Sequence, residues 1–158
     1  MRTVRSAPYA AGSGTRPSAP LHEGTPVSVT AETHVRLARP SRDLAAAERF
    51  WADGLGLTVL FRADAGREPG THDLLMVGHP GASWHLELTR GPVEPRPTEE
   101  DLLVLYLEGP VPGDLVDRLL ACGGTRVGSP NPYWNEWGTT VEDPDGYRLV
   151  LCRRSWRP

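Results

Sequence analysis

Hydrophobic and polar residues alternate with a period of two in several short segments of this chain, and they follow a helical spacing in two others. In the first half, alternation predicts a strand over residues 33–39. An apolar stripe of helical spacing follows, formed by Leu44, Ala47, Phe50 and Trp51. It predicts a helix with Asp43 as its N-cap and Gly54 or Gly56 at its end. Three more strands are predicted after this helix, over residues 57–62, 74–77 and 83–89.

The second half repeats this order of elements. The unbroken apolar run over residues 102–107 predicts a strand that is buried on both faces. Asp114 is the predicted N-cap of a helix with one apolar stripe, and a short strand follows it at residues 124–127. The turn signal at residues 143–146 precedes a strand over residues 147–151 that repeats the strand over 84–88.

The duplication predicts an α+β fold. We expect two βαβββ modules, about residues 32–91 and 101–153, to pair into one cupped mixed sheet, because one module alone has too little core and an open edge. A proline-rich linker at residues 92–97 joins them within a single domain, 28–158. Residues 1–27 are rich in Ala, Gly, Ser, Pro and Thr without an apolar period, which predicts a flexible leader.

Composition narrows the class of function. With 39% hydrophobic and 23% charged residues, the chain is typical of a globular protein, and its net charge of −3 gives no basic footprint for nucleic acid. No apolar stretch is long enough for a membrane helix or a signal peptide, so we expect a cytoplasmic protein. Cys122 and Cys152 lack metal-type spacing and are expected to be reduced, packed thiols.

The period of two also predicts which side chains share a face. If one set of apolar residues packs beneath the helices (Val35, Leu37, Trp84, Leu86 and Leu88), then His34, Arg36, His85 and Glu87 point to the opposite, concave face. The same parity brings a second, largely apolar set to that face: Leu102, Val104, Tyr106, Arg148, Val150 and Cys152. Such a cup suits a small organic ligand with one charged or oxygen-rich end.

The aromatic loop over residues 131–137 adds a second candidate feature. Tyr133 and Trp134 can stack on a flat ligand, or they can cover an open end of the sheet or a dimer interface. The predicted ligand-binding residues are therefore His34, Arg36, Tyr106, Tyr133, Trp134 and Arg148, with Glu87 and His85 as the candidate catalytic pair.

The duplicated βαβββ order, together with the turn at residues 143–146, resembles the vicinal oxygen chelate superfamily. This superfamily includes glyoxalase I, bleomycin-resistance proteins, fosfomycin-resistance enzymes and extradiol dioxygenases. The resemblance covers residues 32–153 and is closest to an uncharacterised bacterial branch. It implies a homodimer and four metal-ligand positions, two in each copy. His34 and Glu87 match the first pair, whereas the second pair falls on Leu102, or Leu103 with a slip of one residue, and on Val150.

An incomplete metal site favours binding over metal chemistry. We expect a small-molecule-binding protein of the bleomycin-resistance type, active in secondary metabolism, which sequesters an aromatic or oxygenated metabolite or acts on it without a cofactor. Two enzymatic alternatives stay open. A Zn, Mn, Ni or Fe ion on His34 and Glu87 would serve a lyase or dioxygenase, and Glu87 as a general base would serve a metal-free isomerase or cyclase.

Overall fold

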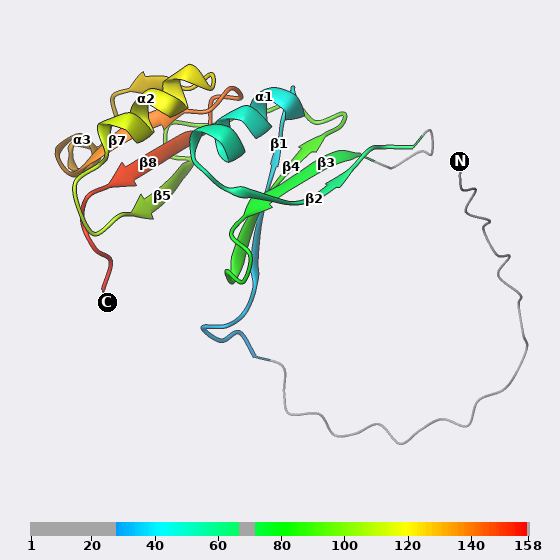
Figure 1. The fold of residues 1–158 in the computed structure, drawn as a ribbon, viewed down its shortest axis with the longest axis horizontal. Helices are drawn as coiled ribbons and strands as arrows, with labels where there is room; N and C mark the ends of the chain where they lie inside the picture. The colour runs from blue at the N-terminus through cyan, green and yellow to red at the C-terminus, as the bar shows by residue number, and fades with distance from the viewer. Residues whose placement is uncertain (1–27, 67–71, 158) are drawn as a thin grey trace, which may run out of the picture. The chain divides into compact units, whose positions relative to one another are not determined.

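The computed structural model describes residues 28–66 and 72–157 (Figure 1). The chain divides into two units, Met1–Ala31 and Glu32–Pro158, and the described helices and strands belong to the second. The flexible leader predicted over residues 1–27 lies outside the described residues. No helix in the described ranges combines the length and the apolar character needed to cross a membrane.

The first module follows the predicted order of elements. Its elements are β1 (Val35–Pro40), α1 (Leu44–Glu48), the π-helical turn η1 (Arg49–Gly54), β2 (Thr58–Ala63), β3 (Asp73–Gly78) and β4 (Trp84–Arg90). Asp43 caps α1 as expected, because its carboxylate accepts the backbone N–H groups of Ala45 and Ala46 at 2.9 and 3.2 Å. The chain leaves the helix at Gly56, whose φ of +90° favours glycine.

The second module contains one helix more than predicted. Its elements are β5 (Leu102–Tyr106), α2 (Gly113–Ala121), β6 (Thr125–Val127), α3 (Pro132–Trp137), β7 (Gly138–Glu142) and β8 (Arg148–Cys152). The aromatic segment expected to be a loop is α3, capped by the Asn131 side chain, which accepts the Tyr133 N–H at 3.0 Å. Asp114 is not the cap of α2: Pro112 holds that position, and Asp114 lies in the first turn, paired with Arg118.

The strands form two four-stranded mixed sheets, in the orders β1-β4-β3-β2 and β5-β8-β7-β6. In each sheet the first and last strands of the module, β1 with β4 and β5 with β8, are parallel, and the other neighbours are antiparallel. The α+β fold of two βαβββ modules is confirmed, with the expected cupped sheet present as two halves. Every residue of β5 is only half-buried, so the prediction of a strand buried on both faces is wrong: β5 lies at the edge of its sheet.

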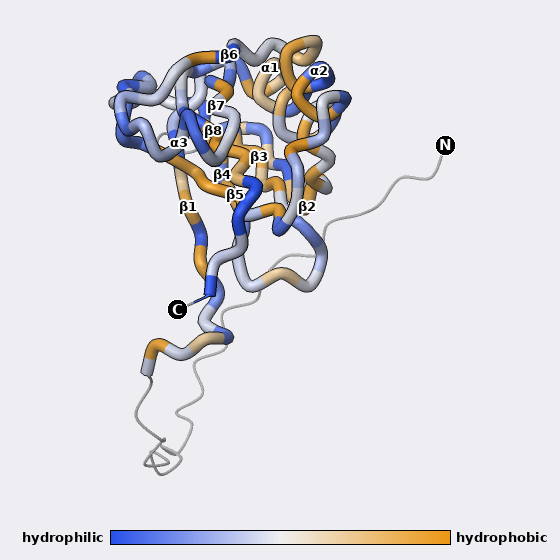
Figure 2. Tube along the Cα trace, turned by 90° about the vertical axis from the view of Figure 1, so that its left-hand side faces the viewer, coloured by the Kyte–Doolittle hydropathy of each residue, from blue (hydrophilic) through white to orange (hydrophobic). Residues whose placement is uncertain are grey.

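One core serves both modules. Helices α1 and α2 lie on the same side of the two sheets, and α2 packs against η1 (Figures 1 and 2). The fully buried side chains at this junction come from both halves, and they include Phe50, Trp51, Leu119, Val141 and Leu149. Cys122 and Cys152 are both free thiols, as expected.

A polar contact crosses the same junction. The Trp51 indole N–H donates to Asp143 Oδ2 at 3.2 Å, inside the core. Asp143 begins the turn after β7, and its other oxygen accepts the backbone N–H groups of Asp145 and Tyr147. Next to this turn, the guanidinium of Arg39 lies 4.6 Å from the centre of the Tyr147 ring. The predicted turn signal therefore also joins the two modules.

Candidate functional site

Four polar side chains converge on β1 and β4, as their parity predicts. The parallel register places Arg36 opposite His85 and Ala38 opposite Glu87, and paired residues of neighbouring strands point to the same face. Arg36 Nη1 lies 3.0 Å from Glu87 Oε2, and Arg36 Nε donates to His85 Nε2 at 3.2 Å. His34, immediately before β1, brings its Nε2 to 2.6 Å from His85 Nδ1. We call these four residues the β1–β4 cluster.

The hydrogen bonds of the cluster assign its protons. A guanidinium can only donate, so His85 Nε2 must accept, and a neutral His85 then carries its proton on Nδ1. This Nδ1–H donates to His34 Nε2, which leaves the His34 proton on Nδ1. The result is a directed chain of donors from Arg36 through His85 to His34.

Burial and electrostatics favour the neutral form of His85. Its pKa is lowered first by burial and then by the electrostatic influence of His34 and Arg36, whereas Glu87 acts in the opposite direction. His85 and Glu87 are both buried, whereas the Arg36 side chain is 53% exposed. A ligand can therefore reach the cluster at Arg36, with His85 and Glu87 behind it.

An apolar groove lies where the edges of the two modules meet, and His85 is the one member of the cluster in its lining, because the other lining residues of β1 and β4 have the opposite parity. It encloses about 210 Å³ and is lined by Val35, Leu37, Trp84, His85, Leu86 and Leu103. Val35 and Leu37 were expected to pack beneath the helices, but they are 58% and 39% exposed, because α1 packs over β3 and β4 instead. These two side chains therefore form a wall of the groove.

The counterpart positions in the second module carry no matching polar pair. Leu102 lies opposite Arg148 as Arg36 lies opposite His85, so the register makes Leu102 the counterpart of Arg36 and not of His34. By the same count, His34 corresponds to Glu100, which lies in the exposed turn before β5. Val150, the counterpart of Glu87, is fully buried and contributes no surface to a cup.

The donors of the first module do not fit a divalent metal ion. His34 points one ring nitrogen at His85 instead of at a shared centre, and the Arg36 cation lies on both His85 and Glu87. Across residues 28–66 and 72–157, no group of three or more His, Cys, Asp or Glu side chains is arranged to hold a metal. Val150 and Leu102 supply no further ligand atom. The cluster is thus arranged as an ion pair and a hydrogen-bond chain.

The other predicted site residues lie in the second module. Tyr133 and Trp134 of α3 pack edge to face, with ring centroids 4.9 Å apart, and Arg154 Nη1 donates to the Tyr133 hydroxyl at 3.4 Å. Tyr106, at the end of β5, lies 5.9 Å from the Trp156 ring. No hydrogen bond, ion pair or ring contact found in the described ranges joins these aromatic residues to the β1–β4 cluster.

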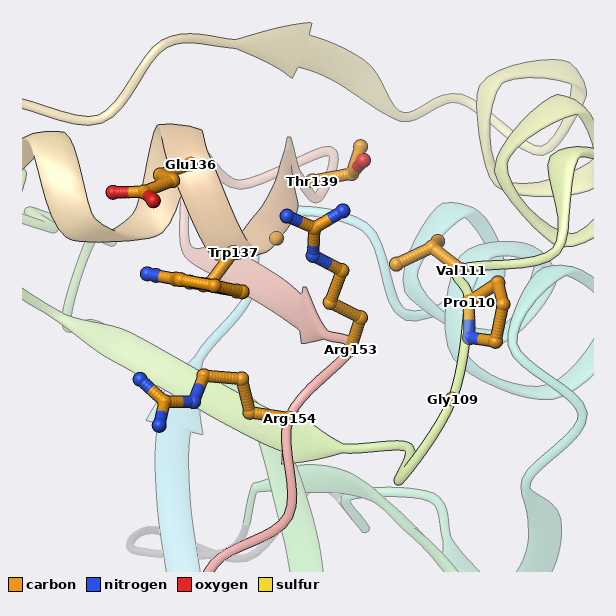
Figure 3. Close-up of a pocket in the computed structure, with 9 residues that line it drawn as sticks. Gly109, Pro110, Val111, Glu136, Trp137, Thr139, Arg153 and Arg154 are labelled. Atoms are coloured by element: carbon orange, nitrogen blue, oxygen red, sulfur yellow. The ribbon is translucent and has the colours of Figure 1, made fainter.

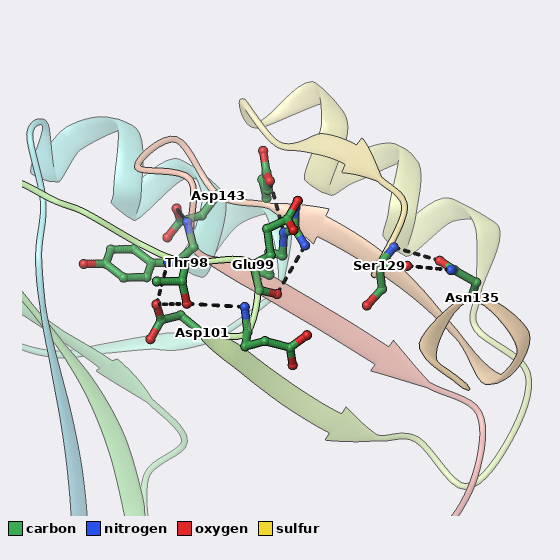
Figure 4. A network of polar contacts seen from close by, with 10 residues as sticks. Thr98, Glu99, Asp101, Ser129, Asn135 and Asp143 are labelled. Carbon is green, nitrogen blue, oxygen red and sulfur yellow. Dashed lines mark hydrogen bonds and ion pairs between the residues drawn. The ribbon is translucent and has the colours of Figure 1, made fainter. Parts of the chain in front are cut away.

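Arg148 faces a different set of groups. Its guanidinium is buried and donates to the Glu142 carboxylate at 3.2 Å and to the backbone and side chain of Glu99 at 3.2 and 3.3 Å (Figure 4). The neighbouring turn is closed by Thr98, which donates through its backbone and hydroxyl to Asp101. These contacts hold the turn before β5 onto β8, and they use the donors that a ligand would need.

A larger cavity was not predicted from the sequence. It encloses about 550 Å³ at the end of the second sheet, between α3 and the connection from β5 to α2 (Figure 3). Its lining includes Val111, Trp137, Arg153 and Arg154. Its sequence signals were Trp137, the last residue of the aromatic segment over residues 131–137, and the two adjacent arginines after β8, although a pair of arginines near a chain end is common on surfaces.

Comparison with known proteins places this arrangement in a family. The family models for the YycE-like N-terminal and C-terminal domains match residues 35–89 and 100–153. An uncharacterised YycE protein from Bacillus subtilis is 38% identical over 121 residues, 74% of this chain and 85% of its own. A crystal structure of a YycE protein of unknown function from the same species has a TM-score of 0.64 at 32% identity, covering 80% of this chain and 93% of its own.

More distant structures share the fold. Glyoxalase I from Leishmania major has a TM-score of 0.56 at 18% identity, covering 75% of this chain and 84% of its own. TnmS3, an antibiotic-binding protein from Streptomyces sp. CB03234, has a TM-score of 0.52 at 28% identity, covering 78% of this chain and 98% of its own. The expected resemblance is confirmed: the chain belongs to the YycE-like family and has the fold of the vicinal oxygen chelate superfamily.

Proposed function

We propose that the protein binds a small organic molecule without a metal, in the groove between β1 and β5. The observation that carries this proposal is the place of His85, which lines the apolar groove and also belongs to the polar chain from Arg36 to His34. A groove with apolar walls beside a polar cluster is a candidate site for a small ligand.

The chemistry of the lining indicates the ligand class. Val35, Leu37 and Leu103 would contact an apolar or aromatic body, with Trp84 offering a ring for stacking. Arg36 does not line the groove, but its half-exposed guanidinium lies on the same edge strand β1 and would donate to a carbonyl, hydroxyl or carboxylate oxygen that extends beyond the groove. The ligand is then an oxygenated molecule, such as an antibiotic-like product of secondary metabolism. In this proposal the protein is a homodimer in the cytoplasm and sequesters that ligand. The antibiotic-binding activity of the related TnmS3 supports this class.

A metal-free enzyme is the second candidate, and the short contact between His34 and His85 favours it. The hydrogen bond between the two imidazoles, at 2.6 Å, gives a path along which a proton can pass, and the carboxylate of Glu87 is held on the same face. Glu87 would take a proton from a carbon next to a carbonyl group, and His85 would return one elsewhere on the same molecule. Such an isomerisation or cyclisation needs no oxidant and no metal.

Blocking the groove tests the binding proposal. Bleomycin, fosfomycin and 1,4-dihydroxyanthraquinone are titrated by calorimetry against the wild type and against Val35→Trp, whose indole would fill the groove from a half-exposed position. We expect saturable binding of at least one compound by the wild type and none by Val35→Trp. The control is Val93→Trp in the exposed linker, which should bind as the wild type does. Equal binding by both variants would refute the proposed site.

A matched pair of variants tests the polar end of the proposed site. Arg36→Gln should weaken binding about tenfold or more, because a charged hydrogen bond to the ligand is lost. The control is Arg62→Gln. Arg62 lies on β2 of the same sheet, has nearly the same side-chain exposure as Arg36 (52% against 53%) and pairs with Glu48 of α1, so this variant should leave affinity unchanged.

Mass spectrometry of the bound compound after incubation separates the two candidate functions. An unchanged compound means binding, and a product that Glu87→Gln abolishes means catalysis.

A further inference from the structure

The cavity at the end of the second sheet is built around one tryptophan and two arginines. Trp137 ends α3, and Arg153 and Arg154 directly follow β8. The Arg153 backbone N–H donates to the Trp137 carbonyl at 2.9 Å, which holds the two segments together. The guanidinium carbons of Arg153 and Arg154 lie 4.7 and 4.8 Å from the Trp137 ring centre, on opposite sides of the ring (Figure 3).

These contacts leave the arginines able to bind an anion. A guanidinium attracted to an aromatic ring makes no hydrogen bond to it in the conventional sense, so its N–H donors stay available for a ligand. No ion pair found in the described ranges engages Arg153 or Arg154, and the Arg154 contact to the Tyr133 hydroxyl takes a single donor. The chain as a whole carries a net charge of −3, so two arginines without a carboxylate partner at one cavity are a local excess of positive charge.

The rest of the lining sets the shape of the ligand. Pro110 and Val111 form the wall that faces Arg153, and they offer apolar surface (Figure 3). The Glu136 carboxylate also lines the cavity, at the opposite end of the Trp137 ring from Arg153 (Figure 3). A volume of about 550 Å³ falls within the range of small-molecule sites. We propose that this cavity is a second binding site, for a small organic molecule with an apolar body and one carboxylate or phosphate group held by Arg153 and Arg154.

Charge-matched probes test this site. Naphthalene-2-carboxylate, 2-naphthyl phosphate and the neutral 2-naphthalenemethanol share one apolar body and are titrated against the full-length protein by calorimetry. We expect saturable binding of at least one anion, with the neutral compound about tenfold weaker or more. The comparison of the two anions tells a carboxylate site from a phosphate site. Equal affinity for the neutral compound, or no saturable binding of either anion at millimolar concentration, would overturn the proposal.

Variants then place the anion. Arg153→Gln and Arg154→Gln change exposed side chains, so the fold should persist, and each should weaken anion binding about tenfold. Arg126→Gln removes an exposed arginine of β6 that does not line the cavity, and it should have no effect. Equal weakening by all three variants would mean non-specific attraction and would contradict the site. Val35→Trp, which fills the groove of the first module, should leave anion binding intact, so the two sites can fail independently.

Discussion

Asp143 and His85 are buried titratable residues with opposite pKa shifts. They should therefore change the stability of the protein with pH in opposite directions. Burial raises the pKa of Asp143 from 3.8 to about 6, although its backbone hydrogen bonds and Arg39 favour the charged form, while Asp145 adds to the increase. Burial and positive neighbours lower the pKa of His85. The two residues lie at different places, one at the junction of the modules and one in the β1–β4 cluster, so their effects can be separated by mutation.

Asp143 should make the protein more stable in mild acid. Since the folded state holds this proton more tightly than the unfolded chain, the contribution is complete below about pH 3.8 and is lost as the pH rises through about 6. Its size is about 2–3 kcal/mol. Urea unfolding from about pH 4 to about pH 7 should show this slope in the wild type and not in Asp143→Asn. A slope that persists in Asp143→Asn would contradict the assignment.

The Asp143→Asn variant should also lose stability above about pH 6, by about 1–3 kcal/mol. The asparagine oxygen can still accept the backbone N–H groups of Asp145 and Tyr147, but its NH2 group would face the Trp51 N–H, donor against donor. This loss is measured at about pH 7, where the carboxyl of the wild type is ionised.

His85 should act in the opposite direction. A lowered pKa means that the unfolded chain binds the proton more readily, so the contribution is complete above about pH 6.5 and is lost as the pH falls through the lower folded value. His85→Gln should therefore flatten the fall in stability below about pH 6.5, and the exposed His79→Gln should not. The free energy of unfolding from urea titrations checks this, and identical curves for the two variants would exclude His85 as the source.

At the scale of elements, α3 departs most from what sequence pattern predicts. Its six residues are mostly aromatic or proline, and periodicity over so short a span cannot tell a helix from a loop. The cap by Asn131 and packing against β7 and β8 stabilise it. The strands that were given ranges from sequence were predicted to within one or two residues at their ends, because alternation along a strand is a local property, whereas β7 was given no range.

The close approach of α3 to its sheet requires Gly138. An added Cβ would lie 2.9 Å from the Leu151 carbonyl, 3.0 Å from Val150 Cγ1 and 3.3 Å from the Trp134 carbonyl. We expect Gly138→Ala to lower the free energy of unfolding by about 1–3 kcal/mol. Gly113→Ala, at the start of α2 with open space around the new methyl group, should be neutral or stabilising. A similar cost for both substitutions in denaturant titrations would argue against crowding at Gly138.

At the scale of the whole molecule, the two modules have the same fold and different chemistry. The polar cluster belongs to the first module, and the arginine-flanked tryptophan belongs to the second. Between them lie the shared core and the groove at the edges of β1 and β5. On the two proposals above, the duplication offers two separate surfaces for ligands instead of one symmetric metal site.

The asymmetry predicts how the molecule responds to metals. Since Arg36 occupies the space between His85 and Glu87, we expect Zn, Mn, Ni and Fe(II) to leave the melting temperature unchanged. A metal at 100 times its dissociation constant would add about 2.7 kcal/mol of stability, which a thermal melt detects readily. A clear increase that His34→Ala or Glu87→Gln removes would overturn this prediction.

The period of two along β1 and β4 determined from sequence alone that His34, Arg36, His85 and Glu87 share a face, because side-chain parity is set within each strand. The duplicated order of elements determined the fold class, because each element was also predicted from a local pattern of residues. Only the tertiary structure decided that Arg36 lies between His85 and Glu87, that Val150 is buried, and that Arg148 holds the turn before β5. It also decided that Arg153 and Arg154 flank Trp137. These facts depend on strand register and on contacts between residues far apart in the chain, which no local pattern records.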